Sequence, residues 1–222
     1  MTADAAAPPA PRIFPLFAVP LAQVELPEPA PLCSALGQLF LAREGEPVRN
    51  QIHRDTQVGV VESRFDLHTW PDAPVRSLFG FIHASLAATI QQLSQYSPQE
   101  YARLSFNYHS WFHITRRGGH QGMHNHPMAS WSGIFCVDPG DADPEQGSSG
   151  AVRFLDPRPA ADVYSDPGNA AMKNAFRIGA WQYSHRAGHL LLFPSYLVHE
   201  VFPYLGDRPR IVVAFNAWLA MR

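Results

Sequence analysis

The chain has 222 residues, of which 46% are hydrophobic and 16% charged, and its formal net charge is −2. These values are typical of a soluble globular protein with a sizeable core, and they give no field that would attract nucleic acid or a membrane. Cys33 and Cys136 are the only cysteines. Their number and separation exclude a disulfide framework and a cysteine-based zinc finger. The first residues show neither a signal peptide nor a membrane span, so we expect a cytoplasmic protein.

The first 103 residues divide by composition into two parts. Residues 1–12 are rich in alanine and proline, and we expect them to be disordered. Residues 13–103 are expected to form an N-terminal strand and helical support region, with short strands in RIFPLFAVPLAQVELP. Apolar residues at helical spacing predict one helix in APLCSALGQLFLAREGE and a longer one in DAPVRSLFGFIHASLAATIQQLSQY. Ser97, followed three residues later by Glu100, resembles a capping box that begins one further turn.

Residues 104–222 differ from the preceding part in their composition. Short segments rich in β-branched and aromatic residues alternate with glycine, proline and aspartate, which predicts closely spaced strands with no helix between them. Such an order is typical of a barrel or a jelly roll. The stretches 138–150 and 156–180 are expected to be excursions that could hang over a barrel mouth. The predicted fold class is therefore mainly β with N-terminal helices.

Three histidines are candidates for a metal site. His124 and His126 lie one residue apart, and alternate residues of a strand project from the same face, so their imidazoles could share one ion. A third ligand would come from elsewhere in the chain. His199 follows an apolar strand and a Pro-Ser turn, and its apolar neighbours suggest that it is buried. Each histidine can also be interpreted as an ordinary surface or core residue.

An arginine in an apolar strand is the second unusual feature. Arg210 lies eleven positions after His199, in PRIVVAFN. A guanidinium is costly to bury unless an anion meets it, and its planar fork suits a carboxylate. The alternative is a surface arginine on an edge strand. Asn216 shares the alternation parity of Arg210, and Ser130 and Ser132 share that of the two nearby histidines, so these side chains could face one pocket.

Together, the HNH sequence, the histidine of LLLFPSYLVHEVFP and the arginine of PRIVVAFN resemble the Fe(II)/2-oxoglutarate-dependent oxygenases. The resemblance also includes TRRGGHQGMHNH and VRFLDPR. It is closest to uncharacterised bacterial members and extends over about residues 104–218. It implies a double-stranded β-helix (jelly-roll) core, with Fe(II) as cofactor and 2-oxoglutarate as cosubstrate. The implied metal ligands are His124, His126 and His199, and the implied cosubstrate-binding residues are Arg210, Thr115 and Asn216.

One position departs from the family pattern, which is HxD or HxE. His126 stands where the family carries a carboxylate, so three bound imidazoles would form a neutral triad and leave the iron one more unit of positive charge. Alternatively, His126 turns away and leaves a coordination position open, as in the family's halogenases. The resemblance implies no catalytic side chain beyond the metal ligands. Ser132 and Arg158 are candidates for substrate contact, although Arg158 could equally pair with Asp156.

The implied reaction is hydroxylation of an unactivated C–H bond of a small molecule or a peptide side chain. It would consume O2 and decarboxylate 2-oxoglutarate to succinate. Two alternatives stay open: a cupin-like three-histidine dioxygenase or isomerase that needs no 2-oxoglutarate, and a non-catalytic jelly-roll binding protein. Arg210 discriminates against the cupin, which needs no anchor for a cosubstrate carboxylate. The sequence contains no basic patch that would predict nucleic-acid binding. Whether the chain forms a homodimer is left open.

Overall fold

The computed structural model describes residues 10, 12–45, 48–52, 54–142 and 147–222. Most of the segment 1–12, His53 and the middle of the stretch 138–150 lie outside the described residues. The elements in chain order are β1 (Ala22–Glu25), α1 (Pro29–Ala42), β2 (Gln57–Glu62), the 3-10 turn η1 (Leu67–Thr69), α2 (Ala73–Leu93), α3 (Pro98–Tyr101), β3 (Leu104–His124), β4 (Trp131–Asp138), β5 (Val152–Phe154), the 3-10 turn η3 (Asn174–Phe176), β6 (Trp181–Tyr183), β7 (His189–Pro194), β8 (His199–Val201) and β9 (Arg210–Met221).

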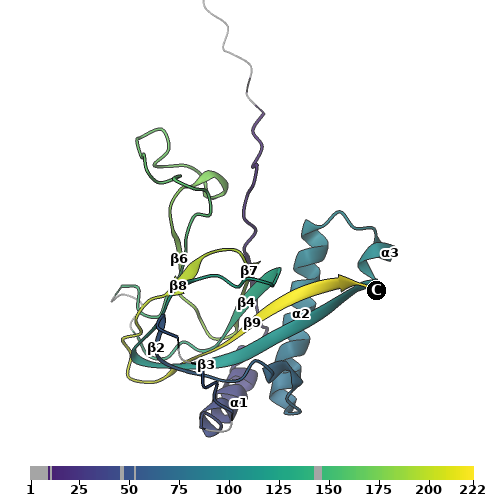
Figure 1. Ribbon diagram of the computed structural model, residues 1–222, viewed down its shortest axis with the longest axis vertical. Helices are drawn as coiled ribbons and strands as arrows, with labels where there is room; N and C mark the ends of the chain where they lie inside the picture. The colour runs from purple at the N-terminus through teal and green to yellow at the C-terminus, as the bar shows by residue number, and fades with distance from the viewer. Residues whose placement is uncertain (1–9, 11, 46–47, 53, 143–146) are drawn as a thin grey trace, which may run out of the picture.

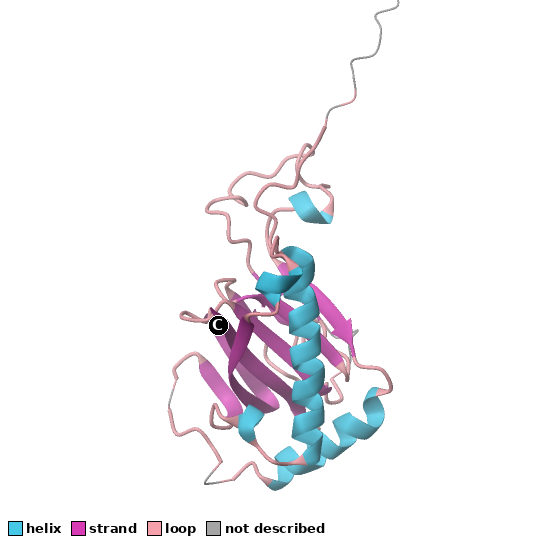
Figure 2. Ribbon diagram, turned by 90° about the vertical axis from the view of Figure 1, so that its right-hand side faces the viewer, coloured by secondary structure: helices cyan, strands magenta, loops and turns pink. Residues whose placement is uncertain are grey.

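The long helix α2 is built on the apolar spacing that predicts it. Val75, Leu78, Ile82, Leu86 and Ile90 recur every three or four residues, and all five are buried. By length and composition alone, α2 could cross a membrane. Here its apolar stripe packs against the sheet in the core, and Figure 2 shows the helix lying across one face of the strands.

The two shorter helices also agree with the sequence. Helix α1 buries Cys33, Leu36 and Phe40 in the same core as α2. At the start of α3, the Glu100 N–H donates to the Ser97 hydroxyl at 3.3 Å, and the Ser97 N–H donates to the Glu100 carboxylate at 2.9 Å. The predicted capping box is therefore present.

The strands form one antiparallel sheet that curls on itself. Its order is β1-β7-β4-β9-β3-β8-β5-β6, with β2 also paired to β3. The 21-residue strand β3 pairs with β9 and β2 along most of its length and with β8 near its end. It therefore joins a large arm of the sheet to the small arm β8-β5-β6. Figure 1 shows the two arms as a half-barrel with α1 and α2 outside the large arm.

Two of the strands come from outside residues 104–222. Strand β1 lies in the stretch where short strands are predicted, and it pairs with β7. The pattern of residues 57–62 does not predict a strand, yet β2 pairs with β3, placing Glu62 opposite His113. The division into 13–103 and 104–222 stays a prediction, and both of these strands pair across that boundary.

Two hydrophobic clusters hold the sheet. The larger one joins α1 and α2 to the outer face of the large arm. The smaller one fills the inside of the half-barrel, where Ile134, Phe154, Leu191, Phe193 and Val212 are all buried. Polar side chains that enter the half-barrel therefore lie next to these apolar residues, here called the apolar floor.

Truncation of the α2 stripe should destabilise the whole domain. Ile82 is fully buried, so Ile82→Ala should lower the free energy of unfolding by about 2–5 kcal/mol, through lost apolar burial and a residual cavity. Gln92→Ala, on the exposed side of the same helix, should change it by less than about 0.5 kcal/mol. Urea unfolding followed by circular dichroism measures both. Equal effects would contradict the packing of α2 on the sheet.

Candidate metal and cosubstrate site

The strand registers bring histidines that are distant in the sequence to one place. His124 at the end of β3 pairs directly with His199 at the start of β8. Directly opposed residues project from the same face of a sheet, so both imidazoles enter the half-barrel. His126 follows two residues later, and its backbone N–H donates to the carbonyl of Ser195 at 2.9 Å. This bond fixes the segment after β3 against the end of β7.

The rings of His124, His126 and His199, here called the triad, converge. Their centroids lie 4.3 Å apart for His124 and His199, 5.0 Å for His124 and His126, and 5.2 Å for His126 and His199. One ring nitrogen of each lies within 4.8 Å of the other two. One metal ion, with metal–imidazole bonds of about 2.0–2.1 Å, could therefore be bound by all three ring nitrogens.

Backbone carbonyls orient two of these imidazoles. Nδ1 of His124 lies 2.8 Å from the carbonyl oxygen of Gly122, and Nδ1 of His199 lies 3.0 Å from that of Leu197. Because a carbonyl can only accept a hydrogen bond, Nδ1 carries the proton in both rings. Nε2 then keeps its lone pair for a metal, which is the usual orientation of metal-binding histidines.

Burial keeps the triad uncharged. It lowers the pKa of His126 to about 3, with further lowering by the neighbouring His199 and His124. Burial, reinforced by His124, likewise lowers the pKa of His199 to about 3, and burial also lowers the pKa of His124. Neutral imidazoles have available lone pairs, so the triad could bind a cation at neutral pH without first releasing protons.

Arg210 lies in the same pocket as the triad. It pairs with Thr115 across β9 and β3, and the two residues are 4% and 3% exposed. The interpretation of Arg210 as a surface residue is therefore wrong. Its buried Nη2 has no hydrogen-bond partner among the described residues, and burial lowers its pKa. Arginine nevertheless stays charged, so this unpaired cation marks a place for an anion.

The pocket has a volume of about 570 Å³, counted with the solvent at its mouth. A glycine packs against the arginine stem. Gly150 has a φ of +63°, and a Cβ at that position would lie 3.0 Å from Cδ of Arg210. The side chains that line the pocket between the triad and Arg210 include Val60, Trp111, His113, Thr115, Ile134, Phe193 and Val212.

Of the two predicted pocket serines, Ser132 enters the pocket wall and Ser130 does not. The Ser132 hydroxyl donates to Oδ1 of Asn216 at 2.8 Å, and it lies 2.8 Å from the hydroxyl of Ser195. Asn216 is on the face of β9 that carries Arg210, but it is not among the residues that line the pocket. Since its oxygen accepts from Ser132, its amide N–H groups are what Asn216 could offer to a ligand.

A buried ion pair in the pocket wall has no clear signal in the sequence. Oε2 of Glu62 lies 2.9 Å from Nε2 of His113, and Oε1 accepts from Arg54 and Asn50. Burial alone would raise the pKa of Glu62, but the contacts with His113 and Arg54 outweigh it and lower the pKa to about 2. Glu62 was missed because β2 is short and apolar residues occupy both of its faces.

Arg158, predicted as a substrate contact, lies outside this pocket. Its guanidinium donates to the carboxylate of Asp156 at 2.9 and 2.6 Å, which is the alternative pairing weighed from the sequence. It lines a second cavity, of about 1220 Å³ counted with open solvent, between residues 16–21 and the excursion 156–180. The ring of Phe154 separates this cavity from His199, with a centroid distance of 5.6 Å between the two rings.

The donor set fits a divalent first-row metal. Neutral imidazole suits iron, nickel, copper and zinc, and the cluster of ligand atoms contains no carboxylate among the described residues. The triad and Arg210 line the same pocket. A ligand that chelates the ion and carries a distant carboxylate would therefore be complementary to both.

Comparison with known proteins points to one family. Residues 109–216 match the model of the family described as "Putative 2OG-Fe(II) oxygenase". The match contains the triad and Arg210, and it confirms the family that the sequence resembles. No curated sequence matches the chain.

Solved structures agree in fold. A Pseudomonas putida prolyl-4-hydroxylase is 19% identical with a TM-score of 0.60, and the match covers 91% of this chain and 92% of that one. A Trichoplax adhaerens prolyl hydroxylase in complex with a peptide fragment of hypoxia inducible factor is 10% identical, with a TM-score of 0.59 and coverage of 89% and 83%. The epimerase SnoN from nogalamycin biosynthesis, in complex with Fe3+, alpha ketoglutarate and nogalamycin RO, is 13% identical, with a TM-score of 0.58 and coverage of 91% and 81%. The predicted jelly-roll fold is confirmed.

Removal of one triad imidazole should weaken metal binding. His126→Ala should reduce the affinity for Co(II), used as a spectroscopic probe, by more than the roughly 10–100-fold typical of losing a supporting residue. His120→Ala is the matched control, because His120 also lines the pocket but does not belong to the cluster of converging ligand atoms. Metal-free protein titrated with Co(II) gives both affinities. An unchanged affinity in His126→Ala would remove His126 from the ligand set.

The Glu62 ion pair should make stability depend on pH in the acid range. The folded pKa of about 2 is below the ordinary value of 4.5, so ionised Glu62 stabilises the fold above pH 4.5. This contribution, about 3 kcal/mol at most, is lost as the pH falls from 4.5 towards 2. Urea unfolding should therefore show the advantage of wild type over Glu62→Gln shrinking across that interval. An advantage that does not change with pH would contradict the pairing.

Proposed function

Since residues 109–216 match the 2OG-Fe(II) oxygenase family model and the fold is that of solved 2OG oxygenases, we propose that the triad binds Fe(II) and that Arg210 binds the distal carboxylate of 2-oxoglutarate. One observation carries the proposal. A charged guanidinium with a buried, unpaired Nη2 lies in the same pocket as three converging imidazoles. Leaving such a group unpaired is costly, and a carboxylate is the anion that its planar fork fits best.

The triad would bind the metal, and Arg210 and Thr115 would bind the cosubstrate. The triad holds the ion through neutral nitrogens, so the ion keeps both positive charges and attracts the dianion of 2-oxoglutarate. Arg210 sets the depth to which the cosubstrate enters, and Thr115, opposite it, could donate a hydroxyl to the same carboxylate. When bound, iron with 2-oxoglutarate supplies the oxidising chemistry, in which O2 is consumed and the keto acid becomes succinate and CO2.

The apolar floor would protect this chemistry from water. Ile134, Phe193 and Val212 line the pocket between the triad and Arg210. An apolar, enclosed site strengthens the electrostatic contact between Arg210 and a carboxylate, and it limits side reactions with solvent. No protein side chain needs to act as a general acid or base, in keeping with the sequence, which indicates no catalytic residue beyond the ligands.

The proposed reaction is hydroxylation of an unactivated C–H bond in a small molecule or a peptide side chain. The prolyl hydroxylases of the same fold support this choice of reaction. The epimerase SnoN shows that the fold also serves other outcomes. Ser132 and Asn216 are the proposed contacts that orient the reacting bond.

The buried arginine also weighs against both alternatives. A cupin-like enzyme that does not bind 2-oxoglutarate would not need a buried cation such as Arg210 in the pocket. A non-catalytic barrel would carry the cost of burying Arg210 without any gain from an anion.

Arg210→Ala should abolish tight binding of 2-oxoglutarate. The protein is loaded with Fe(II) without oxygen and titrated with 2-oxoglutarate, while a visible absorption band and the heat of binding are followed. Loss of a buried charge pair costs about 2–5 kcal/mol, so the dissociation constant should rise by at least about 30-fold.

Arg158→Ala is the matched control, because Arg158 pairs with Asp156 outside the pocket and should leave the titration unchanged. Fe(II) binding should persist in both variants, which shows that the pocket is intact. Wild-type protein that gives neither the band nor heat would exclude the proposed function.

A further inference from the structure

A row of aromatic rings leads from the triad to the surface. From His126 it continues through Trp111, Phe65, His109 and Trp218, with successive centroid distances of 6.0, 5.0, 6.4 and 4.8 Å. Trp111 is buried in the pocket wall, whereas Phe65 and Trp218 are half-buried and His109 is exposed. Exposure therefore rises from Trp111 to His109, and the outer rings, Trp218 included, are at least partly open to solvent.

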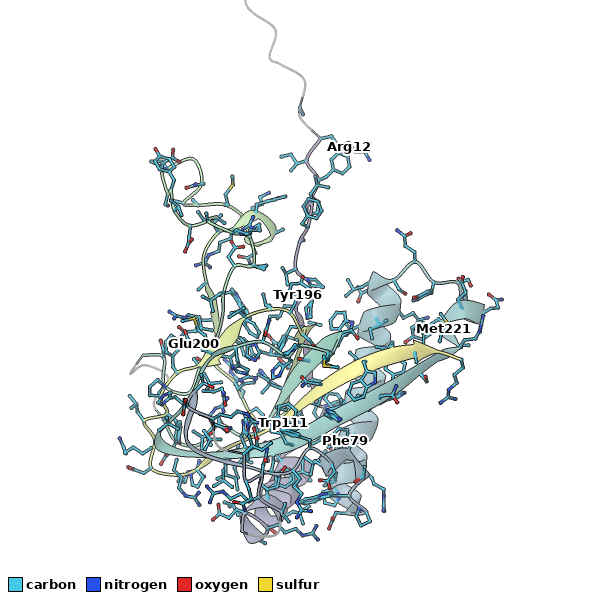
Figure 3. The ribbon with its side chains drawn as sticks, viewed as in Figure 1. Arg12, Phe79, Trp111, Tyr196, Glu200 and Met221 are labelled. Carbon is cyan, nitrogen blue, oxygen red and sulfur yellow. The ribbon has the colours of Figure 1, made fainter. Side chains whose placement is uncertain are left out.

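The outer rings lie on a part of the sheet that extends beyond the barrel. The pairing of β9 with β4 ends at Ala217, but its pairing with β3 continues to Met221. Figure 1 shows this two-stranded overhang of β3 and β9 reaching past β4, with α2 behind it. In Figure 3, Trp111 lies on the sheet near the barrel and Met221 marks the far end of the overhang.

The two faces of the overhang differ in what they contact. Phe106, Tyr108 and Leu219 pack in the core against the helices. The alternate residues point the other way, because Asn107 is paired with Trp218 and His109 with Asn216. This second face is continuous with the pocket, since Arg210, Val212 and Ala214 continue the same alternation along β9 and line the pocket.

The chemistry of this face is aromatic and polar but uncharged. Arg54 lies over the ring of Phe65 at 5.6 Å, yet its charge is paired with Glu62. Aromatic rings bind other rings best in edge-to-face or offset arrangements, and they offer large contact areas with little loss of side-chain freedom. His109 and Trp218 already form an edge-to-face pair with an interplanar angle of 77°. A further flat ring could stack on their free faces.

We propose that Phe65, His109 and Trp218, the aromatic shelf, bind a flat, uncharged, conjugated ring of the substrate. Asn216, oriented by Ser132, would contact the part of the substrate that passes from the shelf to the pocket mouth. The inference rests on the proposed function, because it takes the pocket as the place of reaction. It narrows the substrate class to molecules that carry a planar ring next to the reacting C–H bond.

The second cavity is the competing place for such a ring. Its lining includes apolar residues as well as charged ones such as Arg158 and Arg177, and Phe154 separates it from His199, whereas the shelf is joined to the triad ring by ring. Phe17, which lines that cavity and is 90% exposed, provides the matched control for an aromatic truncation.

The test uses 2-(hydroxymethyl)anthraquinone as the probe, with the full chain loaded with Co(II) and 2-oxoglutarate, and binding measured by calorimetry. Wild type should bind the probe, and Trp218→Ala should weaken binding by about tenfold, the order of one lost aromatic contact. Trp218→Phe, which keeps a ring, should stay within about threefold of wild type. Phe17→Ala should bind as wild type does. An analogue of the probe whose rings are saturated, and which is therefore not planar, should bind at least about tenfold more weakly than the planar probe.

Three results with the planar probe would overturn the shelf. They are no binding of the probe to wild type, equal binding by wild type and Trp218→Ala, or a loss of binding in Phe17→Ala. Preference for an unstructured proline-containing decapeptide over the planar probe would also overturn it. Titration with 2-oxoglutarate alone separates this failure from failure of the proposed function, because Arg210 contacts the cosubstrate and the shelf does not.

Discussion

The register of β3 against its three neighbours determines which key side chains of the site lie opposite one another. Its pairing with β9 places Thr115 opposite Arg210, its pairing with β2 places His113 opposite Glu62, and its pairing with β8 places His124 opposite His199. A slip of one residue would turn all of these side chains to the helix-covered face. The register between β2 and β3 shifts across the part of β3 that contains Gly118 and Gly119. A Cβ at Gly119 would lie only 2.6 Å from the carbonyl oxygen of Gly59, so glycine is required where β2 and β3 come this close.

The charge states of these side chains determine what the pocket can bind. The triad is kept neutral by burial, the Glu62 carboxylate is kept ionised by its partners, and Arg210 is left charged without one. The pocket thus has lone pairs at the triad and an unbalanced positive charge at Arg210. A divalent cation and a dicarboxylate together would satisfy both, while either one alone would satisfy only one of them. In the proposed site, His126 stands where the family has a carboxylate ligand, which would shift the charge balance further towards an anionic cosubstrate.

Local sequence patterns predicted those parts of the protein whose signals are local. The α2 stripe, the Ser97 capping box, the HNH spacing and the isolated Arg210 can each be recognised within a few residues. Glu62 and the aromatic shelf could not be predicted in this way, because Glu62 meets His113 and Trp218 meets His109 only through strand pairing across long stretches of chain. Arg158 illustrates the opposite case. Its loop suggested an anion contact, but Asp156, two residues away, already supplies one.

The most direct test of the central claim, that β3 brings the triad and Arg210 into one cation-and-dicarboxylate site, is a crystal structure of the protein grown without oxygen in the presence of Fe(II) and 2-oxoglutarate. The account predicts one ion bound by His124, His126 and His199 through nitrogens at about 2.0–2.2 Å. It also predicts the distal carboxylate of 2-oxoglutarate within hydrogen-bonding distance of Nη2 of Arg210. An ion bound elsewhere, or a cosubstrate that leaves Arg210 unpaired, would contradict it.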